Sequence, residues 1–564
     1  IEKRSGRLEM TGLIAEIYKK AEQGEVRKIT YLMQSILAPP YEGIDLGMGE
    51  KFAISAIAIA AGYSQKEVDS EYKKPGDLGL VAESVLKKKR QQSLAESEMC
   101  ASEVYDSMLK IAKSSGQGSQ DLKIGILAKL IKDSSPTEGK FIVRFVAGQL
   151  RLGIGDPTIL DSLSVSRAGD KSLRPEIERA YNLCDDLGLV AEIFMRSPDS
   201  VRDFHIEAFK PVRPALAERL VGPQEIFDKL GECAIEYKFD GFRMQIHKKG
   251  SRVEIYSRKL EKITFMYQDV TEAVKKLPCK EIIFEGEALA FDSGKNRFYS
   301  FQETMHRRRK YGIGESTKAY PLHVYAFDLL LLDGNDCTNL GYAERRSEME
   351  RIFPSGILMI SEKKIAKSAQ EIEEIFGDSV SRGLEGIMAK DLKAPYIAGA
   401  RKFAWIKLKK SYGKSVDTID AVIVGYFLGR GARAEFEFGG VLAAVYNPER
   451  GKFETVAKIG SGYSEDEMKE LEKTLSAETT KEPPIDLDFK VKPDFWVIPR
   501  HVIEVAFDDI TLSPTHTCGM KDGKGYALRF PRMVKMRPDR EIKECTTSQE
   551  VTEMHAIVKA RGSK

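Results

Sequence analysis

The chain has 564 residues, of which 42% are hydrophobic and 31% are charged, and its formal net charge is +3. This length exceeds what one hydrophobic core supports and predicts roughly three to four domains, while the composition excludes a disordered or fibrous protein. The near-neutral charge does not exclude a nucleic-acid partner, because clustering matters more than the total, and basic runs occur at residues 87–90, 306–310 and 407–410.

The first part of the chain spaces its apolar residues as a helix does. Leu13, Ile14 and Ile17 are one example, and clusters of proline, glycine and serine divide the pattern into short pieces. We therefore predict an all-α domain over residues 1–205.

The sequence predicts where two helices of this domain begin. Asp156 is predicted to be an N-cap because a proline follows it, and Thr137 precedes the apolar run 141–152. The turn at 152–156 contains two glycines, which favours a tight helix connection over a phosphate site at a helix N-terminus.

A period of two begins after the proline-bearing segment 209–214, which is typical of a linker. A helix is predicted at 370–376. The predicted strands are 234–239, 243–248, 252–256, 282–284, 288–291 and 323–327. Residues 206–413 are therefore predicted to form an α+β domain.

The last part of the chain is predicted to be rich in strands. One helix is expected at about 464–475, and the predicted strands are 421–428, 441–446, 453–459 and 502–507. About five strands in this length fit a small closed barrel, and the OB-fold is the natural candidate. We assign this β-barrel domain to residues 414–564.

The most informative motif is Lys-x-Asp-Gly-x-Arg, which begins at Lys238. A lysine can attack a phosphate as a nucleophile if its surroundings favour the free amine, and a following glycine allows close approach of the backbone. Alone, this motif is more commonly an exposed strand lysine. Five further blocks follow it in order, at residues 257–261, 284–287, 325–328, 383–390 and 405–409.

Taken together and in this order, the blocks resemble those of the covalent nucleotidyltransferases, most closely the ATP-dependent DNA ligases of the archaeal and eukaryotic replicative type. The resemblance covers nearly the whole chain. It implies a helical DNA-binding domain, an adenylation (nucleotidyltransferase) domain and an OB-fold domain, with ATP as the AMP donor and Mg²⁺ or Mn²⁺ as the metal.

The resemblance also implies roles for individual residues. Lys238 is the catalytic nucleophile, Glu236 lies beside the adenine amino group, and Phe327 stacks on adenine. Glu287 and Glu385 hold the metal, with Glu287 also close to the nucleotide. The residues implied to contact the nucleotide or a 5′-phosphate are Arg243, Arg258, Arg401 and Lys407, and Lys390 is a further candidate for a phosphate contact.

Each of these residues also has an ordinary interpretation. Without the resemblance, glutamates beside glycine are mostly surface residues, and an apolar strand phenylalanine such as Phe327 is mostly core. Arg258 and Arg401 would each be expected in a surface ion pair. Near the C-terminus, residues 526–532 and 536–540 resemble the last ligase motif, in which Arg540 stands where the family usually has lysine.

The expected reaction has three steps. Lys238 takes AMP from ATP, the AMP passes to the 5′-phosphate at a nick in duplex DNA, and the adjacent 3′-hydroxyl seals the strand and releases AMP. The resemblance implies roles in DNA replication, repair and recombination.

Other classes remain open at this point. A capping guanylyltransferase or an RNA ligase shares most of the blocks but does not need the helical domain, and residues 141–155 resemble the DNA-binding domain of replicative ligases. An NAD-dependent bacterial ligase is disfavoured because its cysteine-rich zinc module is missing. A non-catalytic nucleic-acid clamp is disfavoured by the intact Lys238, Glu287, Glu385 and Lys407.

The remaining expectations concern surroundings and partners. The seven cysteines form no Cys-x-x-Cys pair, which argues against a zinc site and a disulfide framework. No signal peptide is visible, and the longest nearly apolar stretch, residues 52–63, is too short to cross a bilayer. We expect a cytoplasmic, DNA-associated monomer that binds nicked duplex DNA, with a sliding clamp as a candidate partner. The first residue is Ile1, which suggests that a few residues precede it.

Overall fold

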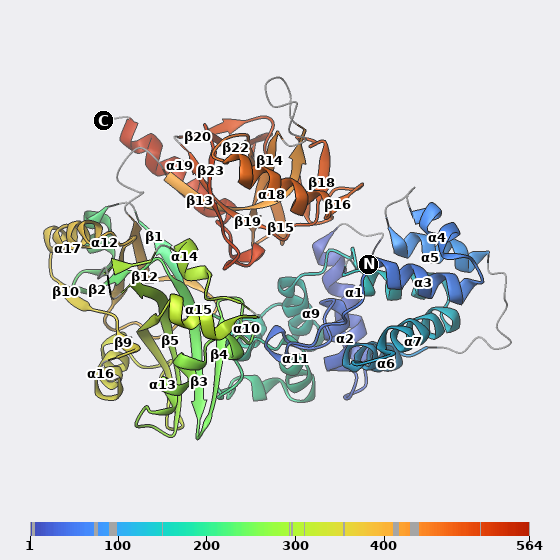
Figure 1. Ribbon diagram of the computed structural model, residues 1–564, viewed down its shortest axis with the longest axis horizontal. Helices are drawn as coiled ribbons and strands as arrows, with labels where there is room; N and C mark the ends of the chain where they lie inside the picture. Colours follow the sequence, from blue (N-terminus) through green and yellow to red (C-terminus); the bar gives the residue numbers. More distant parts are fainter. Residues whose placement is uncertain are drawn as a thin grey trace.

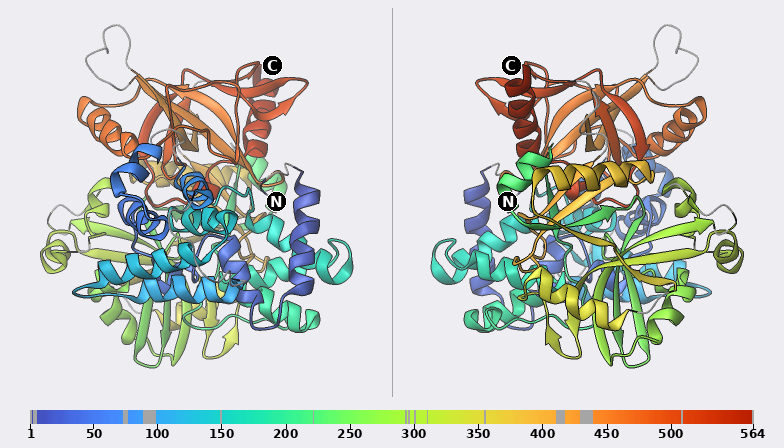
Figure 2. Two further views of the ribbon diagram at one scale, coloured as in Figure 1. Left: turned by 90° about the vertical axis from the view of Figure 1, so that its right-hand side faces the viewer. Right: turned by 90° about the vertical axis from the view of Figure 1, so that its left-hand side faces the viewer.

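The computed structural model describes residues 2, 6–72, 77–88, 99–148, 150–220, 222–292, 294, 297–299, 301–309, 311–353, 356–409, 417–428, 439–507 and 509–562. Three regions follow one another along the chain and meet in a triangle, with the C-terminal region above the other two (Figure 1). In both side views the C-terminal region again lies above, and the other two regions overlap below it (Figure 2). Within the described residues, no helix is both long and apolar enough to span a membrane.

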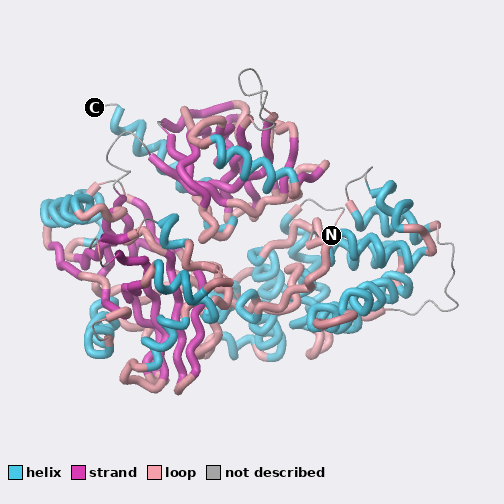
Figure 3. Tube along the Cα trace, in the orientation of Figure 1, coloured by secondary structure: helices cyan, strands magenta, loops and turns pink. Residues whose placement is uncertain are grey.

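The N-terminal region is helical, as predicted (Figure 3). Its elements are α1 (Arg7–Lys20), α2 (Val26–Met33), η1 (Pro40–Glu42), α3 (Glu50–Ala61), α4 (Gln65–Tyr72), α5 (Leu78–Lys87), α6 (Ala101–Lys113), α7 (Ser119–Asp133), α8 (Pro136–Val146), α9 (Asp156–Ala168), α10 (Arg174–Cys184), α11 (Leu187–Arg196) and η2 (Pro198–Val201). One core joins α3 with α5 to α8, and a second joins α1 with α9 to α11.

Both predicted helix starts in this region were wrong in detail. The N-cap of α8 is Ser135, whose hydroxyl accepts from the Glu138 N–H while the Glu138 carboxylate accepts from the Ser135 N–H. This reciprocal capping outcompetes the predicted start at Thr137. Helix α9 begins at Asp156, so Asp156 is not its N-cap, and its carboxylate instead accepts hydrogen bonds from Gln34 and Tyr181.

The central region contains two sheets. The five-stranded sheet has the order β1 (Leu216–Arg219), β12 (Arg401–Lys409), β11 (Gly386–Asp391), β2 (Cys233–Lys238), β10 (Lys363–Ala366). The other sheet has the order β4 (Arg252–Ser257), β3 (Phe242–Lys249), β5 (Glu281–Asp292), β7 (Leu322–Leu332), β8 (Asn335–Asp336), with β6 (Arg297–Phe298) on β5 and β9 (Leu358–Ile360) on β7. The helical elements are α12 (Pro223–Leu230), η3 (Thr264–Met266), α13 (Gln268–Lys275), α14 (Phe301–Met305), α15 (Ile313–Ala319), α16 (Tyr342–Ile352) and α17 (Ala369–Ser381).

One strand in the central region is longer than predicted. Residues 282–284 and 288–291 belong to the single strand β5, which runs through Gly286. A side chain at Gly286 would start 2.8 Å from Val324 and 3.1 Å from the Tyr325 carbonyl oxygen on β7. The glycine therefore permits close approach of two strands, although glycine within a strand pattern normally weakens a strand prediction.

The C-terminal region is rich in strands, as predicted, and the helix predicted at 464–475 is α18. Its strands are β13 (Asp417–Phe427), β14 (Gly440–Asn447), β15 (Lys452–Ile459), β16 (Thr479–Thr480), β17 (Leu487–Asp488), β18 (Phe495–Val497), β19 (Val502–Phe507), β20 (Asp509–Ser513), β21 (Cys518–Lys521), β22 (Lys524–Arg529) and β23 (Arg532–Met536). Its helical elements are α18 (Glu465–Ser476), η6 (Ile542–Glu544) and α19 (Ser548–Gly562). Strands β13 to β19 form one sheet together with β23. Strands β20 to β22 form a second, smaller sheet. There are more strands than the five predicted, and the predicted boundary between residues 413 and 414 lies outside the described residues.

The predicted linker at 209–214 is attached along the central region. The Val212 N–H donates to Gln245 Oε1 at 2.7 Å, and Gln245 Nε2 donates back to the Val212 carbonyl at 2.8 Å. The Phe209 N–H donates to His247 Nδ1 at 2.9 Å. Because strand β3 carries both partners, the linker is fixed to the sheet next to the residues described below.

Candidate active site

One face of the five-stranded sheet carries the predicted nucleophile. In the register of β2, β11 and β12, Lys238 is opposite Gly386, which is opposite Lys409, and the adjacent row on the same face joins Glu236 to Lys407 across β11. Side chains alternate along a strand, so these residues project from one face. The other face packs apolar side chains against α12 and α17 in a core that contains Ile226, Ile235, Ile372, Ile387, Ile406 and Leu408.

Lys238 ends β2 and is paired with a carboxylate. Its Nζ lies 2.6 Å from Glu385 Oε2, and the Lys409 ammonium contacts the other oxygen of Glu385. Burial would raise the pKa of Glu385, but Lys238 and Lys409 outweigh burial and hold that pKa well below its ordinary value. The Glu385 N–H also donates to the Lys238 carbonyl at 3.1 Å. The Lys238 side chain is therefore held between two strands by one carboxylate.

Gly386 makes this arrangement possible. Its φ is +149°, and a Cβ there would lie 2.1 Å from the Leu408 carbonyl oxygen. Only glycine avoids this collision, so the chain can turn directly after Glu385 and enter β11.

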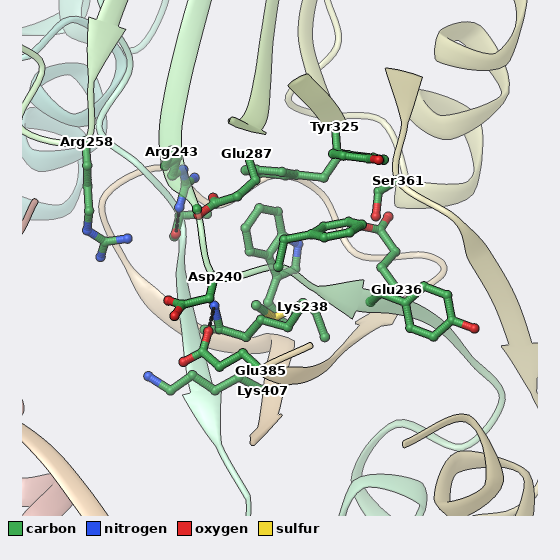
Figure 4. A pocket seen from close by; sticks show the side chains of 18 of the residues that line it. Glu236, Lys238, Asp240, Arg243, Arg258, Glu287, Tyr325, Ser361, Glu385 and Lys407 are labelled. Atoms are coloured by element: carbon green, nitrogen blue, oxygen red, sulfur yellow. Dashed lines mark hydrogen bonds and ion pairs between the residues drawn. The ribbon is translucent and has the colours of Figure 1, made fainter. Parts of the chain in front are cut away.

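Glu287 approaches Lys238 from the other sheet (Figure 4). It lies on β5 opposite Arg243 of β3. Burial raises the pKa of Glu287 to about 7 against the opposing effects of Lys238 and Arg243, and Glu385 raises it further. Two carboxylates, one on β5 and one directly before β11, thus converge on the pocket that contains Lys238.

Arg243 is fixed beside an aromatic wall. Its Nη2 lies 2.5 Å from Glu285 Oε2, which also accepts from the Tyr396 hydroxyl at 2.8 Å. Burial opposes the charge on Arg243, but Glu285 outweighs it and raises the pKa. The guanidinium carbon is 5.3 Å from the centre of the Phe327 ring, and Phe327 meets Trp405 edge to face at 5.9 Å.

The C-terminal region completes the pocket. Arg537, Asp539 and Arg540 line it together with residues of both central sheets. Arg258 Nε lies 2.7 Å from Glu544 Oε2, and the Arg401 guanidinium is paired with Glu550 of α19. Basic residues near the C-terminus therefore cover the pocket, and acidic residues of the same region pair with two of its arginines.

Lys407 lies on the floor of the pocket near these cations. Burial lowers the pKa of Lys407 well below its ordinary value, and Arg401 lowers it further, although Glu550 opposes this shift. A half-buried ammonium so placed is poised for an anionic ligand, because an added negative charge would stabilise its protonated form.

The structure brings the predicted site residues into one pocket, whose lining includes Glu236, Lys238, Arg243, Arg258, Glu287, Phe327, Glu385, Arg401 and Lys407. Sequence reasoning missed Tyr325 and Ser361, which also line it (Figure 4), as well as Glu544 and Glu550. Tyr325 lies in the block 325–328, two residues before Phe327, so its position in that block could have indicated it. No local pattern marks Ser361, Glu544 or Glu550. Lys390 is fully buried, with its Nζ 3.1 Å from Glu236 Oε2.

The carboxylates suit a divalent cation that arrives with a ligand. Among the described residues, no group of three or more His, Cys, Asp or Glu side chains is arranged to hold a metal ion. Mg²⁺ needs only one or two protein carboxylates when phosphate oxygens and water complete its shell. Glu287 and Glu385 fit that requirement.

The sequence matches three families in chain order. Residues 1–164 match the family described as DNA ligase N terminus, residues 214–409 match ATP dependent DNA ligase domain, and residues 434–540 match ATP dependent DNA ligase C terminal region.

Full-length relatives are similar over nearly the whole chain. A protein named "Probable DNA ligase" from Dictyoglomus thermophilum is 44% identical over 560 residues, which are 98% of this chain and 95% of that protein. A protein named "DNA ligase" from Sulfurisphaera tokodaii is 43% identical over 576 residues, covering 99% of this chain and 96% of the relative. A solved structure titled "mycobacterial DNA ligase D complexed with ATP and MES" is 24% identical with a TM-score of 0.36, over 59% of this chain and 98% of its own.

Proposed function

The chain belongs to the family of ATP-dependent DNA ligases, and on that premise we propose that Lys238 is the nucleophile through which it seals nicks in duplex DNA. The observation that carries this proposal is the position of Lys238, 2.6 Å from Glu385 in a pocket that also contains Glu287 and Lys407. A structural strand lysine would not need converging carboxylates and cations from both the central and the C-terminal regions.

The proposed reaction begins with attack of the Lys238 amine on the α-phosphorus of ATP. A P–N bond forms, the bond from the α-phosphorus to the bridging oxygen breaks, and pyrophosphate leaves while the amine loses its proton. Arg243 and Lys407 are placed to bind phosphate oxygens, and Arg537 and Arg540 are placed above them. Fixed cations of this kind stabilise charge that develops at phosphorus and hold the reacting groups in line.

We propose that the two later steps take place in the same pocket. A 5′-phosphate oxygen at the nick attacks the phosphorus of lysyl-AMP, which breaks the P–N bond and frees Lys238. The 3′-hydroxyl then attacks the 5′-phosphate, forms the phosphodiester bond and expels AMP. Arg258 and Arg401 are our candidates for the 5′-phosphate, which would compete with Glu544 and Glu550 for them.

We assign Glu287 and Glu385 to a divalent cation, Mg²⁺ or Mn²⁺, which when bound would neutralise negative charge on the phosphates. We further propose that Phe327 stacks on adenine and that residues 1–205, 206–413 and 414–564 are the DNA-binding, adenylation and OB-fold domains. The expected monomer, the sliding-clamp partner and the roles in replication, repair and recombination stay predictions.

The test is the intact mass of the protein after incubation with Mg²⁺ and ATP, GTP or NAD. We expect an AMP adduct from ATP that is absent in Lys238→Ala and present in Lys249→Ala, a matched change at an exposed lysine of β3. Nicked duplex DNA should discharge the adduct, with strand joining visible on a denaturing gel. An unmodified wild-type protein would favour a non-catalytic clamp, and a GMP adduct would favour a capping enzyme.

A further inference from the structure

We infer that Tyr342 and Lys390 are positioning residues that select adenine over guanine, by holding Glu236 as a hydrogen-bond acceptor at the end of the pocket away from Lys238. The inference rests on the proposed use of ATP at this site. It assigns Lys390 to base selection and not to phosphate binding.

Glu236 has a partner at each carboxylate oxygen. Oε1 accepts from the hydroxyl of Tyr342, at the start of α16, and Oε2 lies 3.1 Å from the Lys390 ammonium. Arg346, one turn further along α16, places Nη1 3.6 Å from Oε1. Glu236 is 2% exposed but still lines the pocket, beside Ser361 (Figure 4). Its carboxylate is therefore fixed in orientation while a free lone pair can still face a ligand.

Lys390 lines the pocket, but its ammonium is occupied by neighbouring groups. Its ammonium donates to the Phe327 carbonyl at 2.7 Å and lies 4.6 Å from the ring centre of Trp405 and 4.8 Å from that of Tyr342. Burial lowers the pKa of Lys390, and Glu236 opposes that shift. A lysine that is 1% exposed and has these partners is placed to act on Glu236 and the aromatic rings, and not on a triphosphate.

The positions of Lys238 and Lys390 in the sheet place them at opposite ends of the pocket. Lys390 lies four residues along β11 from Gly386, which is opposite Lys238. At about 3.3 Å per residue this places Lys390 about 13 Å from the row of the nucleophile. The intervening row contains Glu236, and the aromatic side chains of Phe327 and Trp405 lie at the Lys390 end. This end fits a planar base, while the Lys238 end fits the α-phosphate.

The chemistry of the base then decides selection. A carboxylate can only accept hydrogen bonds. Adenine offers an amino donor at position 6, whereas guanine offers a carbonyl acceptor at the corresponding atom. A carboxylate held in one orientation therefore accepts a hydrogen bond from the adenine amino group. With guanine in the same position, the carboxylate oxygen and the guanine carbonyl oxygen would both be acceptors and would repel each other. If Glu236 could rotate, the same site would tolerate guanine.

The experiment measures self-adenylylation and self-guanylylation rates of the full chain over a range of ATP and GTP concentrations. The variants are Lys390→Met, Tyr342→Phe and Lys390→Arg. For the first two we expect the KM for ATP to rise about tenfold, kcat to change less than about threefold, and the ATP-to-GTP ratio of kcat/KM to fall about tenfold or more. Lys390→Arg keeps a cation beside Glu236 and should recover most of the ratio.

Two matched controls separate positioning from folding. Lys275→Met removes an exposed lysine of α13, and Tyr267→Phe removes a buried hydroxyl that has no hydrogen-bond partner among the described residues. Both should keep the wild-type ratio. A merely structural role would lower the active fraction for both nucleotides equally, so an unchanged ratio in Tyr342→Phe and Lys390→Met would overturn the inference. Absence of an AMP adduct in the wild-type protein would instead overturn the proposed function. Should Lys390→Met fail to fold, Tyr342→Phe decides alone.

Discussion

The pairing of Arg401 with Glu550 predicts that α19 helps to hold the C-terminal region over the pocket. Glu550 lies near the start of α19, and its carboxylate contacts the Arg401 guanidinium on β12. The side chains of Arg401 and Glu550 are 20% and 13% exposed. The substitution Glu550→Gln removes the charge while it keeps the shape, and should shift the protein toward arrangements in which the C-terminal region has moved away.

The pKa of Glu550 gives the size of the effect. Burial would raise that pKa, but Arg401 and then Lys407 outweigh burial and lower it from 4.5 to about 2. A lowering of this size corresponds to roughly 3 kcal/mol in favour of the ionised, docked state. Because the pKa is lowered, this contribution is present above about pH 4.5 and is lost as the pH falls through about 2. At neutral pH, Glu550→Gln should therefore change the docking equilibrium by about a hundredfold.

Small-angle X-ray scattering at neutral pH would measure this change as a larger radius of gyration. Binding of nicked duplex DNA at one fixed salt concentration should strengthen in parallel, because Arg401 would be released for phosphate. Glu553→Gln is the matched control, since it removes the same charge from an exposed position on the same helix. The reasoning is refuted if Glu550→Gln and wild type give superimposable scattering and equal DNA affinity.

Three further changes test other parts of the structure. Gly386→Ala should abolish lysyl-AMP formation and lower the melting temperature, because the Cβ would lie 2.1 Å from a backbone oxygen. A variant that still forms lysyl-AMP and keeps the wild-type melting temperature would contradict the need for glycine at the start of β11. Arg345→Met should lower the free energy of unfolding in urea by about 3–5 kcal/mol, because it strands the buried Asp328 carboxylate that lies 2.6 Å from Arg345, and Arg345→Met with Asp328→Leu should recover part of that loss. Burial raises the pKa of Glu541 to about 7 and that of Asp185 to about 8. The stability of the docked arrangement should therefore fall as the pH rises from about 4 to 8, and should not change further above pH 8. Small-angle X-ray scattering would measure this as a radius of gyration that grows over that range, and a constant radius would contradict the prediction.

The sequence predicted the site better than it predicted the contacts that close the site. Lys238, Glu287 and Glu385 sit in short blocks whose residue types already suit phosphate chemistry, and these residues line one pocket. The partner of Arg258 is Glu544, 286 residues later, and no periodicity connects them. Ion pairs between regions are long-range contacts that depend on how domains dock, which local patterns do not encode.

The fold shows the same division between local and long-range information. Alternation of apolar residues located β2, β3 and β4 to within about two residues, because burial of one face fixes the period. Gly286 divided β5 into two predicted strands, although the structure needs glycine there for close approach to β7. The helix starts were misplaced by one or two residues because capping is a competition among neighbouring polar side chains.

Register is the step that converts these strands into a pocket. Within β2, the spacing of Glu236 and Lys238 already places both on one face. Only the pairing of β2 with β11 and of β11 with β12 brings that face beside Lys407 and Lys409. A slip of one residue would turn apolar residues such as Ile387 into the pocket and the lysines toward α17. The hydrophobic core beneath the sheet therefore does more than stabilise the fold, because burial of that opposite face fixes the register that aligns Lys238, Glu385 and the neighbouring lysines.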